Sequence, residues 1–383
     1  MEDYSTIAIL EYEPLSRTMG IISRLERSVR KLDILSRVRS NRWAPYSRLM
    51  IASDQRNWSL DWDARELKLI CERLGVVAAN RSYERITTAQ SIFFNSRYDV
   101  LMDWKTMQHR IAFSYFHGRP DSGDDFARMI NTIKTHHDEI ARIQVSHSEM
   151  HEIILETGIN SHKVFKIPIG INPDYFVWTT PEEKQVARMK LGIPQSSVVI
   201  GTFQKDGNGW GEGLKPKLIK GPDVFLKTIK ILKPQVPEIF VLLTGPARGY
   251  VKNGLEKLGV PYLHKYLNDY TQIGEYFNAL DLYIVSSREE GGPKAVLESM
   301  ASGIPLVTSK VGQAMDLVRH CENAWIVEPE DAEELAHWAG YVIDNPSSLR
   351  EVLGRGRLTA EGNSYPSQIP LWREFMSGFV ECA

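Results

Sequence analysis

The stretch Leu282-Tyr-Ile-Val-Ser-Ser-Arg-Glu-Glu-Gly-Gly-Pro-Lys-Ala-Val-Leu-Glu298 combines a predicted strand, a Gly-Gly-Pro turn and a predicted helix. The apolar residues 282–285 are typical of a buried strand, and the helix leads into a further apolar run at Leu306 and Val307. This strand–turn–helix–strand order indicates a parallel α/β sheet. Glu290, directly before two glycines, is a poor choice for packing, so the stretch also indicates a ligand site.

The alternation of strands and helices extends on both sides of this stretch, from about residue 197 onward. Strands are predicted at 198–201, 240–244, 282–285, 306–307 and 325–327, and helices at 223–232, up to 258 and at 270–280. Short apolar runs separated by amphipathic helices favour a parallel sheet covered on both faces. We therefore predict a doubly wound domain over residues 190–360.

The first half of the chain follows the same order less regularly. Strands are predicted at 48–53, 98–102, 110–115, 142–146 and 164–168, and helices at 63–74 and up to 157. These elements predict a second Rossmann-like domain over residues 46–180. Residues 172–184 carry Pro173 and Pro181 without clear periodicity, so we expect a linker there. The amphipathic segment 361–383 either caps its own domain or crosses back to the first, and both arrangements stay open.

Bulk composition excludes several classes of protein. The 383 residues carry a net charge of −2, so the chain lacks the basic footprint of a nucleic-acid binder, and no nucleic-acid partner is expected. The three cysteines are odd in number and too widely spaced for a metal site or a disulfide framework. No apolar run approaches the length of a membrane span, and the N-terminus lacks signal-peptide features. A cytoplasmic protein is expected.

The turn after residue 285 has the chemistry of a nucleotide-sugar site. In open α/β sheets, ligands lie at the carboxyl ends of strands, against the amides of the following helix. Gly291 and Gly292 allow a ligand close to the backbone, and Pro293 suits the first helical turn. The helix start attracts an anion such as a phosphate. Glu298 can face the same crevice and accept hydrogen bonds from vicinal hydroxyls of a ribose.

An ordered series of motifs between about residues 163 and 345 closely resembles the retaining glycosyltransferases of family 4, the glycosyl transferases group 1. The series comprises Pro168-Ile-Gly-Ile-Asn172, Gly201, Lys220-Gly221, Thr244-Gly245, Ala279-Leu-Asp-Leu-Tyr283 and the E-x7-E signature Glu290 to Glu298. The resemblance implies the GT-B architecture, in which two Rossmann-like domains face a cleft with the active site. It also implies metal-independent, retaining transfer of a sugar from a nucleoside-diphosphate sugar to an acceptor hydroxyl.

The resemblance carries roles over to individual residues. It implies that Glu298 holds the ribose hydroxyls, that Glu290 contacts the donor sugar, and that Lys220 and Lys205 bind the diphosphate. The implied catalytic residues are Glu290, His117 and Lys220. The implied donor-binding residues are Lys205, Lys220, Thr244, Gly245, Gly291, Gly292, Pro293, Lys294 and Glu298. Lys215 and Lys217 lie close to Lys205 in the sequence and stay as its alternatives.

The chain departs from the family pattern in three places. Residues 206–214 form a longer connection than usual, with alternating glycines that favour a mobile loop ordering on donor binding over a phosphate-binding nest. The usual glycine-rich loop after the first strand is absent from residues 51–58. His117 is either a cleft residue or a loop histidine bonded to backbone, and Arg119 is a weaker candidate for an acceptor or phosphate contact.

Metal binding is not expected. Asp61 and Asp63 match the D-x-D spacing of metal-dependent glycosyltransferases, but Asp63 is more simply an N-cap or first-turn acid of a helix. His136 and His137 are adjacent on a predicted helix and point in two directions, so they cannot chelate one ion by themselves. No cofactor is expected besides the nucleotide sugar as co-substrate.

Residues 1–45 form a predicted helical extension that is strongly basic between 17 and 42. An apolar stripe runs along this segment, so it either lies on an anionic membrane surface or packs on the first domain. We favour packing, with peripheral contact at the inner face of the membrane as the alternative. The choice bears on the acceptor, which is expected to be a glycan, a glycolipid or a small molecule.

Two other functions are compatible with these residues. One is a nucleotide-sugar epimerase of the same fold, which would convert the donor without any acceptor. The other is a non-catalytic nucleotide-sugar-binding partner protein, which the missing glycine-rich loop favours. Against it, Glu290, Glu298 and Lys220 are all present, and charged groups are costly to keep in a decayed, buried site. The sequence identifies neither the base and sugar of the donor nor the oligomeric state.

Overall fold

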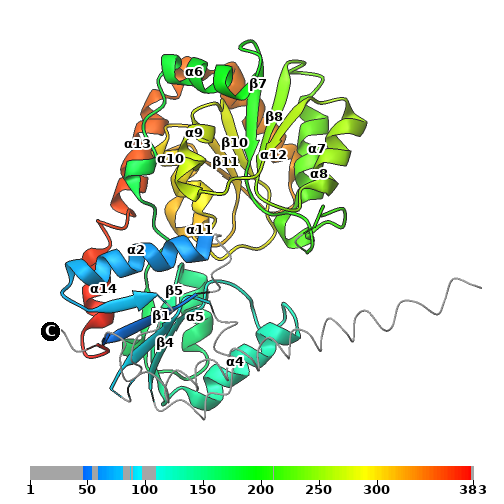
Figure 1. Ribbon diagram of the computed structural model, residues 1–383. Helices are drawn as coiled ribbons and strands as arrows, with labels where there is room; N and C mark the ends of the chain where they lie inside the picture. The colour runs from blue at the N-terminus through cyan, green and yellow to red at the C-terminus, as the bar shows by residue number, and fades with distance from the viewer. Residues whose placement is uncertain are drawn as a thin grey trace, which may run out of the picture.

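The computed structural model describes residues 46–53, 59–80, 87, 89–96, 109–209 and 211–380. Two α/β domains lie one above the other, each built on a six-stranded parallel sheet (Figure 1). The predicted pair of doubly wound Rossmann-like domains is therefore confirmed. The basic extension 1–45, the predicted strand 98–102 and the residues 54–58 lie outside the described residues.

The first sheet has the order β2-β1-β3-β4-β5-β6, and all of its neighbouring strands are parallel. The strands are β1 (Leu49–Ala52), β2 (Ala78–Asn80), β3 (Ser91–Phe94), β4 (Arg110–Ser114), β5 (Ile140–Val145) and β6 (Val164–Lys166). The helices of this half are α2 (Ser59–Arg73), α4 (Asp124–His136) and α5 (Ser148–Leu155). Strands β2 and β3 were not predicted, because runs of three and four residues are too short for a recognisable period.

The second sheet has the order β12-β11-β10-β7-β8-β9. Its strands are β7 (Val198–Thr202), β8 (Ile239–Thr244), β9 (Tyr262–Lys265), β10 (Leu282–Val285), β11 (Leu306–Ser309) and β12 (Trp325–Val327). The helices around it are α6 (Pro181–Leu191), α7 (Pro222–Leu232), α8 (Gly249–Leu258), α9 (Ile273–Phe277), α10 (Lys294–Ala301), α11 (Ala314–Leu317), α12 (Ala332–Asp344) and α13 (Arg350–Gly362). The strand order reverses between β10 and β7, which is where ligands bind in such sheets.

The expected linker at 172–184 is wrong in its second half, because a helix begins there. Thr180 forms a capping box with Glu183, and Pro181 stands at the first helical position of α6, where its missing N–H costs no hydrogen bond. Ala187 and Ile193 are buried in the core of the second domain. Residues from α6 onward therefore belong to the second domain.

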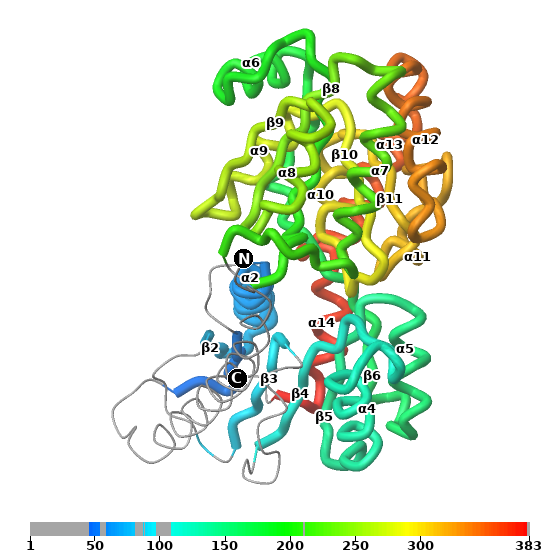
Figure 2. Tube along the Cα trace, turned by 90° about the vertical axis from the view of Figure 1, so that its right-hand side faces the viewer, coloured from blue at the N-terminus to red at the C-terminus, as the bar shows by residue number. Residues whose placement is uncertain are grey.

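The last helix, α14 (Ile369–Met376), lies against the first domain after α13 has run alongside the second (Figures 1 and 2). The rings of Trp372 and Phe375 meet Phe93 of β3 edge to face at 5.9 and 5.7 Å. Ser91 Oγ donates a hydrogen bond of 2.7 Å to the carbonyl of Phe379. The C-terminal segment is thus part of the core of the first domain, and it ties the two domains together.

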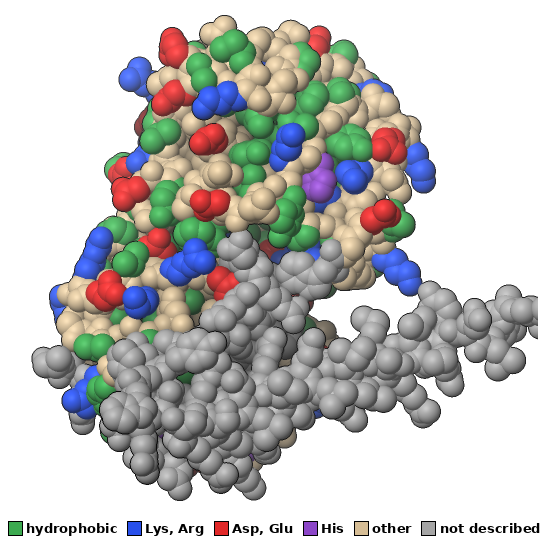
Figure 3. All heavy atoms as spheres, viewed as in Figure 1, with side chains coloured by type: hydrophobic (Ala, Val, Ile, Leu, Met, Phe, Trp, Pro, Cys, Tyr) green, Lys and Arg blue, Asp and Glu red, His purple; other side chains and the backbone are tan. Residues whose placement is uncertain are grey.

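The described surface mixes charges of both signs. On the face in Figure 3, acidic and basic side chains alternate over the second domain without a large patch of one sign, in keeping with the net charge of −2. No helix in the described ranges is long and apolar enough to cross a membrane.

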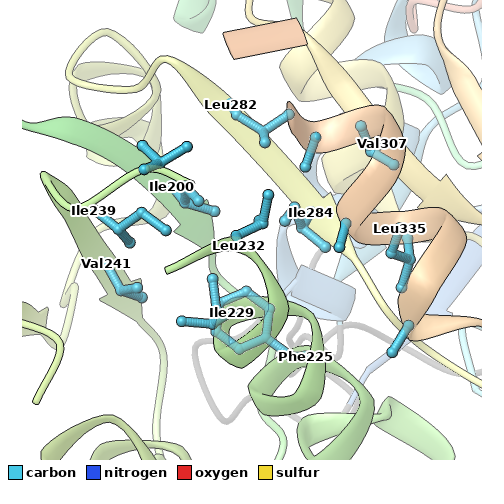
Figure 4. Close-up of a cluster of buried hydrophobic side chains, with 14 of the residues drawn as sticks. Ile200, Phe225, Ile229, Leu232, Ile239, Val241, Leu282, Ile284, Val307 and Leu335 are labelled. Atoms are coloured by element: carbon cyan, nitrogen blue, oxygen red, sulfur yellow. The ribbon is translucent and has the colours of Figure 1, made fainter. Parts of the chain in front are cut away.

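The core of the second domain explains why the strands of its sheet can be predicted from the sequence. Ile200, Ile229, Leu232 and Ile284 are completely buried between the sheet and α7 (Figure 4). Each such side chain stabilises the fold by about 1.5–3 kcal/mol relative to its exposed state. Helix α7 presents its apolar residues at helical spacing, whereas the central strands are apolar throughout because helices cover both faces.

Candidate active site

A cavity of about 200 Å³ lies between the two domains, next to the carboxyl ends of strands from both sheets. The first domain contributes polar residues from the segments that follow β4 and β5, and the second from the segments that follow β10 and β11. These residues are His117, Arg119, His147, Glu149, Arg288, Glu289, Glu290 and Lys310. This is the place at which open α/β sheets bind ligands.

Glu290 and Lys220 meet at this site. The Lys220 ammonium lies 2.5 Å from Oε2 of Glu290, and the exposed fractions of the two side chains are only 18% and 11%. Ser287 Oγ lies 2.9 Å from the other carboxylate oxygen of Glu290 and donates to it. Two of the predicted catalytic residues, 70 positions apart, are therefore in direct contact as a charge-assisted pair.

The glycine after Lys220 explains why the pair forms. Gly221 has a φ of +59°, and a Cβ there would lie 1.8 Å from the carbonyl oxygen of Ser286. Ser286 Oγ in turn donates a 2.9 Å hydrogen bond to the Gly221 carbonyl. Only glycine fits both the left-handed backbone and this close approach. Gly221 therefore contacts the residue that follows β10, and this contact places Lys220 beside Glu290.

Glu298 of α10 is 4% exposed, and its Oε1 accepts a hydrogen bond from the Tyr270 hydroxyl. Burial raises the pKa of Glu298 to about 7, against the opposing effects of Lys294 and of the Tyr270 hydrogen bond. The Tyr270 ring lies 5.7 Å from the ring of Trp62 on α2, measured between centroids. Tyr270, which the sequence reasoning missed, thus bonds the carboxylate that is expected to hold a ribose, and Trp62 of the first domain packs on Tyr270 in turn.

Lys294, a predicted donor-binding residue, joins the two domains instead of lining the described cavity. Its ammonium lies 2.6 Å from Asp63 Oδ1 of α2 and 3.1 Å from the Tyr365 hydroxyl. The same ammonium lies 5.0 and 5.5 Å from the ring centroids of Tyr270 and Tyr365. Helix α2 begins at Ser59, so Asp63 lies in its second turn, and the expectation of an N-cap or first-turn acid is wrong.

Replacing Asp63 by alanine is expected to destabilise the protein by about 3–5 kcal/mol, because it leaves the largely buried Lys294 ammonium without its carboxylate. Asp125→Ala is the matched control: Asp125 pairs with Arg128 on the surface, and its loss is expected to cost less than about 1 kcal/mol. Urea unfolding measures both variants. Equal shifts of the two midpoints would mean that the pair between the domains adds no more to the free energy of unfolding than an exposed surface pair does.

The glycines of the turn accommodate the first domain. A Cβ on Gly291 would lie 2.4 Å from Phe116 Cβ, and one on Gly292 would lie 2.7 Å from Ile169 Cδ1. Ser146 Oγ also donates a 2.5 Å hydrogen bond to the Gly291 carbonyl. The close approach that was predicted for a ligand is made here by residues of the other domain. Pro293 directly precedes α10 as its N-cap residue, one position before the predicted first turn.

The remaining predicted donor-binding residues lie at the ends of β7 and β8. Gly245 has a φ of +81°, and a Cβ on it would lie 3.9 Å from the backbone nitrogen of Lys205, so these two segments are adjacent. The carbonyl of Thr244 accepts a 2.7 Å hydrogen bond from Arg248. These residues flank the loop that holds Lys205, and none of the hydrogen bonds described here joins them to Glu290.

A buried ion pair anchors the first residue of the loop at 206–214, and the expectation that this loop orders on donor binding stays a prediction. Asp206 and Arg248 are each 1% exposed, and Arg248 Nη2 lies 3.0 Å from Asp206 Oδ2. The carbonyls of Glu212 and Gly213 accept hydrogen bonds of 2.7 and 2.9 Å from the first amides of α8. The loop therefore occupies the start of α8, and these amides do not face a phosphate.

His117 faces the cavity. Its Nδ1 lies 3.4 Å from Oε1 of Glu289, and both residues line the same space. Arg119 forms an ion pair with Glu149 at the same cavity. His147, which sequence reasoning missed, is 1% exposed, with Nδ1 2.9 Å from Ser146 Oγ, and burial lowers its pKa. His147 lies two residues after the buried strand β5, and this position at a strand end is the feature of the sequence that could have identified it.

The described residues contain no group of three His, Cys, Asp or Glu side chains that could hold a metal ion. Asp61 is buried in the first turn of α2, and Asp63 is paired with Lys294. His136 lies beside Glu139 and His137 beside Asp138, at separate positions near the end of α4.

Residues 214–357 match the family model of the glycosyl transferases group 1. The chain is 26% identical over 157 residues to an uncharacterized glycosyltransferase of Haemophilus influenzae, covering 40% of this chain and 44% of the relative. It is 25% identical over 185 residues to the lipopolysaccharide core biosynthesis mannosyltransferase LpsB of Rhizobium meliloti, covering 46% and 50%. The chain thus spans about half the length of the curated relatives it matches.

Among solved structures, HepE of Anabaena in complex with UDP and glucose superposes with a TM-score of 0.70 at 14% identity, covering 87% of this chain and 100% of that one. Sucrose-phosphate synthase of Thermosynechococcus elongatus gives a TM-score of 0.69 at 15% identity, with the same coverage. The fold is therefore GT-B. The second domain is similar to the glycosyl transferases group 1.

Proposed function

We propose that the protein is a retaining glycosyltransferase that moves a sugar from a nucleoside-diphosphate sugar to an acceptor hydroxyl. The observation that carries this proposal is the Lys220–Glu290 pair at the interdomain cavity, at the strand ends where a GT-B fold faces its cleft. The matching family model and the names of the relatives support glycosyl transfer, and the resemblance of the E-x7-E signature supports retention of configuration.

In this proposal each charged residue has a separate task. The Lys220 ammonium, together with Lys205, stabilises the negative charge of the diphosphate as it leaves, which is the largest electrostatic demand of the reaction. Glu290 accepts hydrogen bonds from hydroxyls of the donor sugar, and Glu298 accepts them from the ribose. His117 reaches the cavity from the first domain, beside Glu289, and the acceptor hydroxyl would approach from this side.

In this proposal the Lys220 ammonium turns from Glu290, its partner in the structure, to the donor diphosphate, which carries more negative charge than one carboxylate. The Tyr270 hydroxyl donates to one oxygen of Glu298, and a carboxylate can accept further hydrogen bonds, such as those from ribose hydroxyls. Donor binding therefore exchanges contacts within the protein for contacts with the nucleotide.

The proposal is tested with a panel of nucleoside diphosphates and their sugars. A ligand that binds only the folded state raises the melting temperature, so the panel identifies the base and the sugar. The donor found in this way is then incubated with glycan, glycolipid and small-molecule acceptors, and transfer is measured with the anomeric configuration of the product. Complete conversion of the donor without an acceptor would instead indicate an epimerase, and binding without turnover a non-catalytic partner.

Transfer is expected to continue in EDTA, because lysine ammonium groups take the charge of the leaving diphosphate in this proposal. The rate is measured with and without the chelator on protein that has been dialysed against it. Complete loss of activity that manganese restores would contradict metal independence. It would also indicate that Asp61 and Asp63 bind the metal ion.

A further inference from the structure

The Lys220–Glu290 pair is part of a ring of polar contacts that includes two further side chains. Gln204 Nε2 donates a 2.7 Å hydrogen bond to the carbonyl of Lys220. Gln204 Oε1 lies 3.2 Å from Ser287 Oγ, which is 2.9 Å from Glu290 Oε1. The ion pair between Glu290 and Lys220 completes the ring. A carbonyl only accepts hydrogen bonds, so this contact sets which end of the Gln204 amide faces Ser287.

The ring joins three segments that are distant in the sequence. Gln204 follows β7, Lys220 precedes α7 and Ser287 follows β10, and the contacts of Gln204 span 16 and 83 positions. Ser287 is completely buried, and its carbonyl accepts a 2.6 Å hydrogen bond from Ser309 Oγ. Ser287 is therefore a rigid support, and Gln204 connects it to the backbone of Lys220.

The single proton of the Ser287 hydroxyl has two acceptors, Gln204 Oε1 and Glu290 Oε1. The shorter distance and the negative charge favour Glu290. When Lys220 turns to a diphosphate, Glu290 loses its cation, and its remaining partner in the ring is this hydroxyl. At the same time Gln204 still holds the Lys220 backbone in place.

We infer that Gln204 and Ser287 are positioning residues of the site. They keep the Lys220 backbone and the Glu290 carboxylate in place while the Lys220 ammonium moves from Glu290 to the donor diphosphate. The inference rests on the proposed function. It adds two residues to the site that no motif identifies. Neither residue needs to touch the substrate, since both act through Lys220 and Glu290.

The test measures kcat, KM for the donor and affinity for the nucleoside diphosphate in Gln204→Met, Ser287→Ala and the double variant. Methionine keeps the length of the glutamine side chain without its hydrogen bonds. Each single variant is expected to lower kcat about tenfold and to change nucleoside-diphosphate affinity by less than about threefold. The second substitution is expected to cost less than about twofold more, because the first has already opened the ring.

Gln195→Met is the matched control, since Gln195 is an exposed glutamine that donates to the Gln185 carbonyl far from the cavity. Its kinetics are expected to equal those of the wild type. Unchanged kcat in both single variants, or fully additive losses in the double variant, would overturn the inference. If Gln204→Met does not fold, Ser287→Ala alone decides, because it removes only one oxygen atom. Failure of the proposed function would appear differently, as wild-type protein that binds no nucleoside diphosphate.

Discussion

Glu290→Gln is expected to lower turnover roughly 100-fold, the usual cost of removing one group that stabilises charge in a transition state. The carboxylate lies in the interdomain cavity, fixed by Lys220 on one oxygen and by Ser287 on the other. Glutamine has nearly the same shape but no charge, so the change is electrostatic. Affinity for the nucleoside diphosphate is expected not to fall, because the proposed contact of Glu290 is to the sugar and the variant releases the Lys220 ammonium from its ion pair.

The matched control for this variant is Glu333→Gln, at an exposed glutamate that pairs with Lys227 on the outer side of the second domain. Its turnover is expected to equal that of the wild type. Rates under saturating donor separate kcat from binding, and calorimetry gives the affinity for the diphosphate. An equal loss of affinity for the diphosphate and for the full donor would place Glu290 on the nucleotide instead of the sugar.

Glu298→Gln is expected to stabilise the free protein at pH 8 while weakening donor binding. The folded-state pKa of Glu298 is about 7, above the ordinary value of 4.5. Between these values the folded protein keeps a proton that the unfolded chain releases, so stability falls as pH rises through this window and stays low above it. The total cost at pH 8 is on the order of 3 kcal/mol. Glutamine cannot ionise and avoids this cost.

Unfolding midpoints of the wild type and Glu298→Gln at pH 5 and pH 8 test this expectation. The variant should gain stability over the wild type at pH 8 and little at pH 5, where the wild-type carboxyl is protonated in the folded state. Its affinity for the donor should fall about tenfold or more, because ribose hydroxyls lose a charged acceptor. A variant that is less stable than the wild type by the same amount at both pH values would contradict the raised pKa.

The sequence predicts the second domain well because its signals are local. Glu290, the Gly-Gly-Pro turn and Glu298 lie within nine residues on one strand–turn–helix unit, so their spacing alone places them together at the end of a strand. The buried strands around them each hold a run of apolar residues, and the helices between them have a clear period. The first domain is harder to predict because β2 and β3 are too short for a pattern.

The contacts that shape the site are long-range, and no periodicity encodes them. Lys294 meets Asp63 across 231 positions. Gly291 and Gly292 are predicted to let a ligand approach the backbone, whereas the structure places Phe116 and Ile169 of the first domain against them, and only the way the domains face each other reveals this. The loop at 206–214 looks mobile by composition, and only the burial of Asp206 against Arg248 reveals its anchor.

The central claim is that the Lys220–Glu290 site binds the diphosphate of a nucleotide sugar. The most direct test is titration calorimetry of UDP, GDP and ADP into the wild type and into Lys220→Met, which keeps the unbranched side chain without its charge. At least one of the three diphosphates is expected to bind the wild type, and its affinity is expected to fall about tenfold or more in the variant because a charge-assisted hydrogen bond is lost. No binding of any diphosphate to the wild type, or equal affinity in the two proteins, would contradict it.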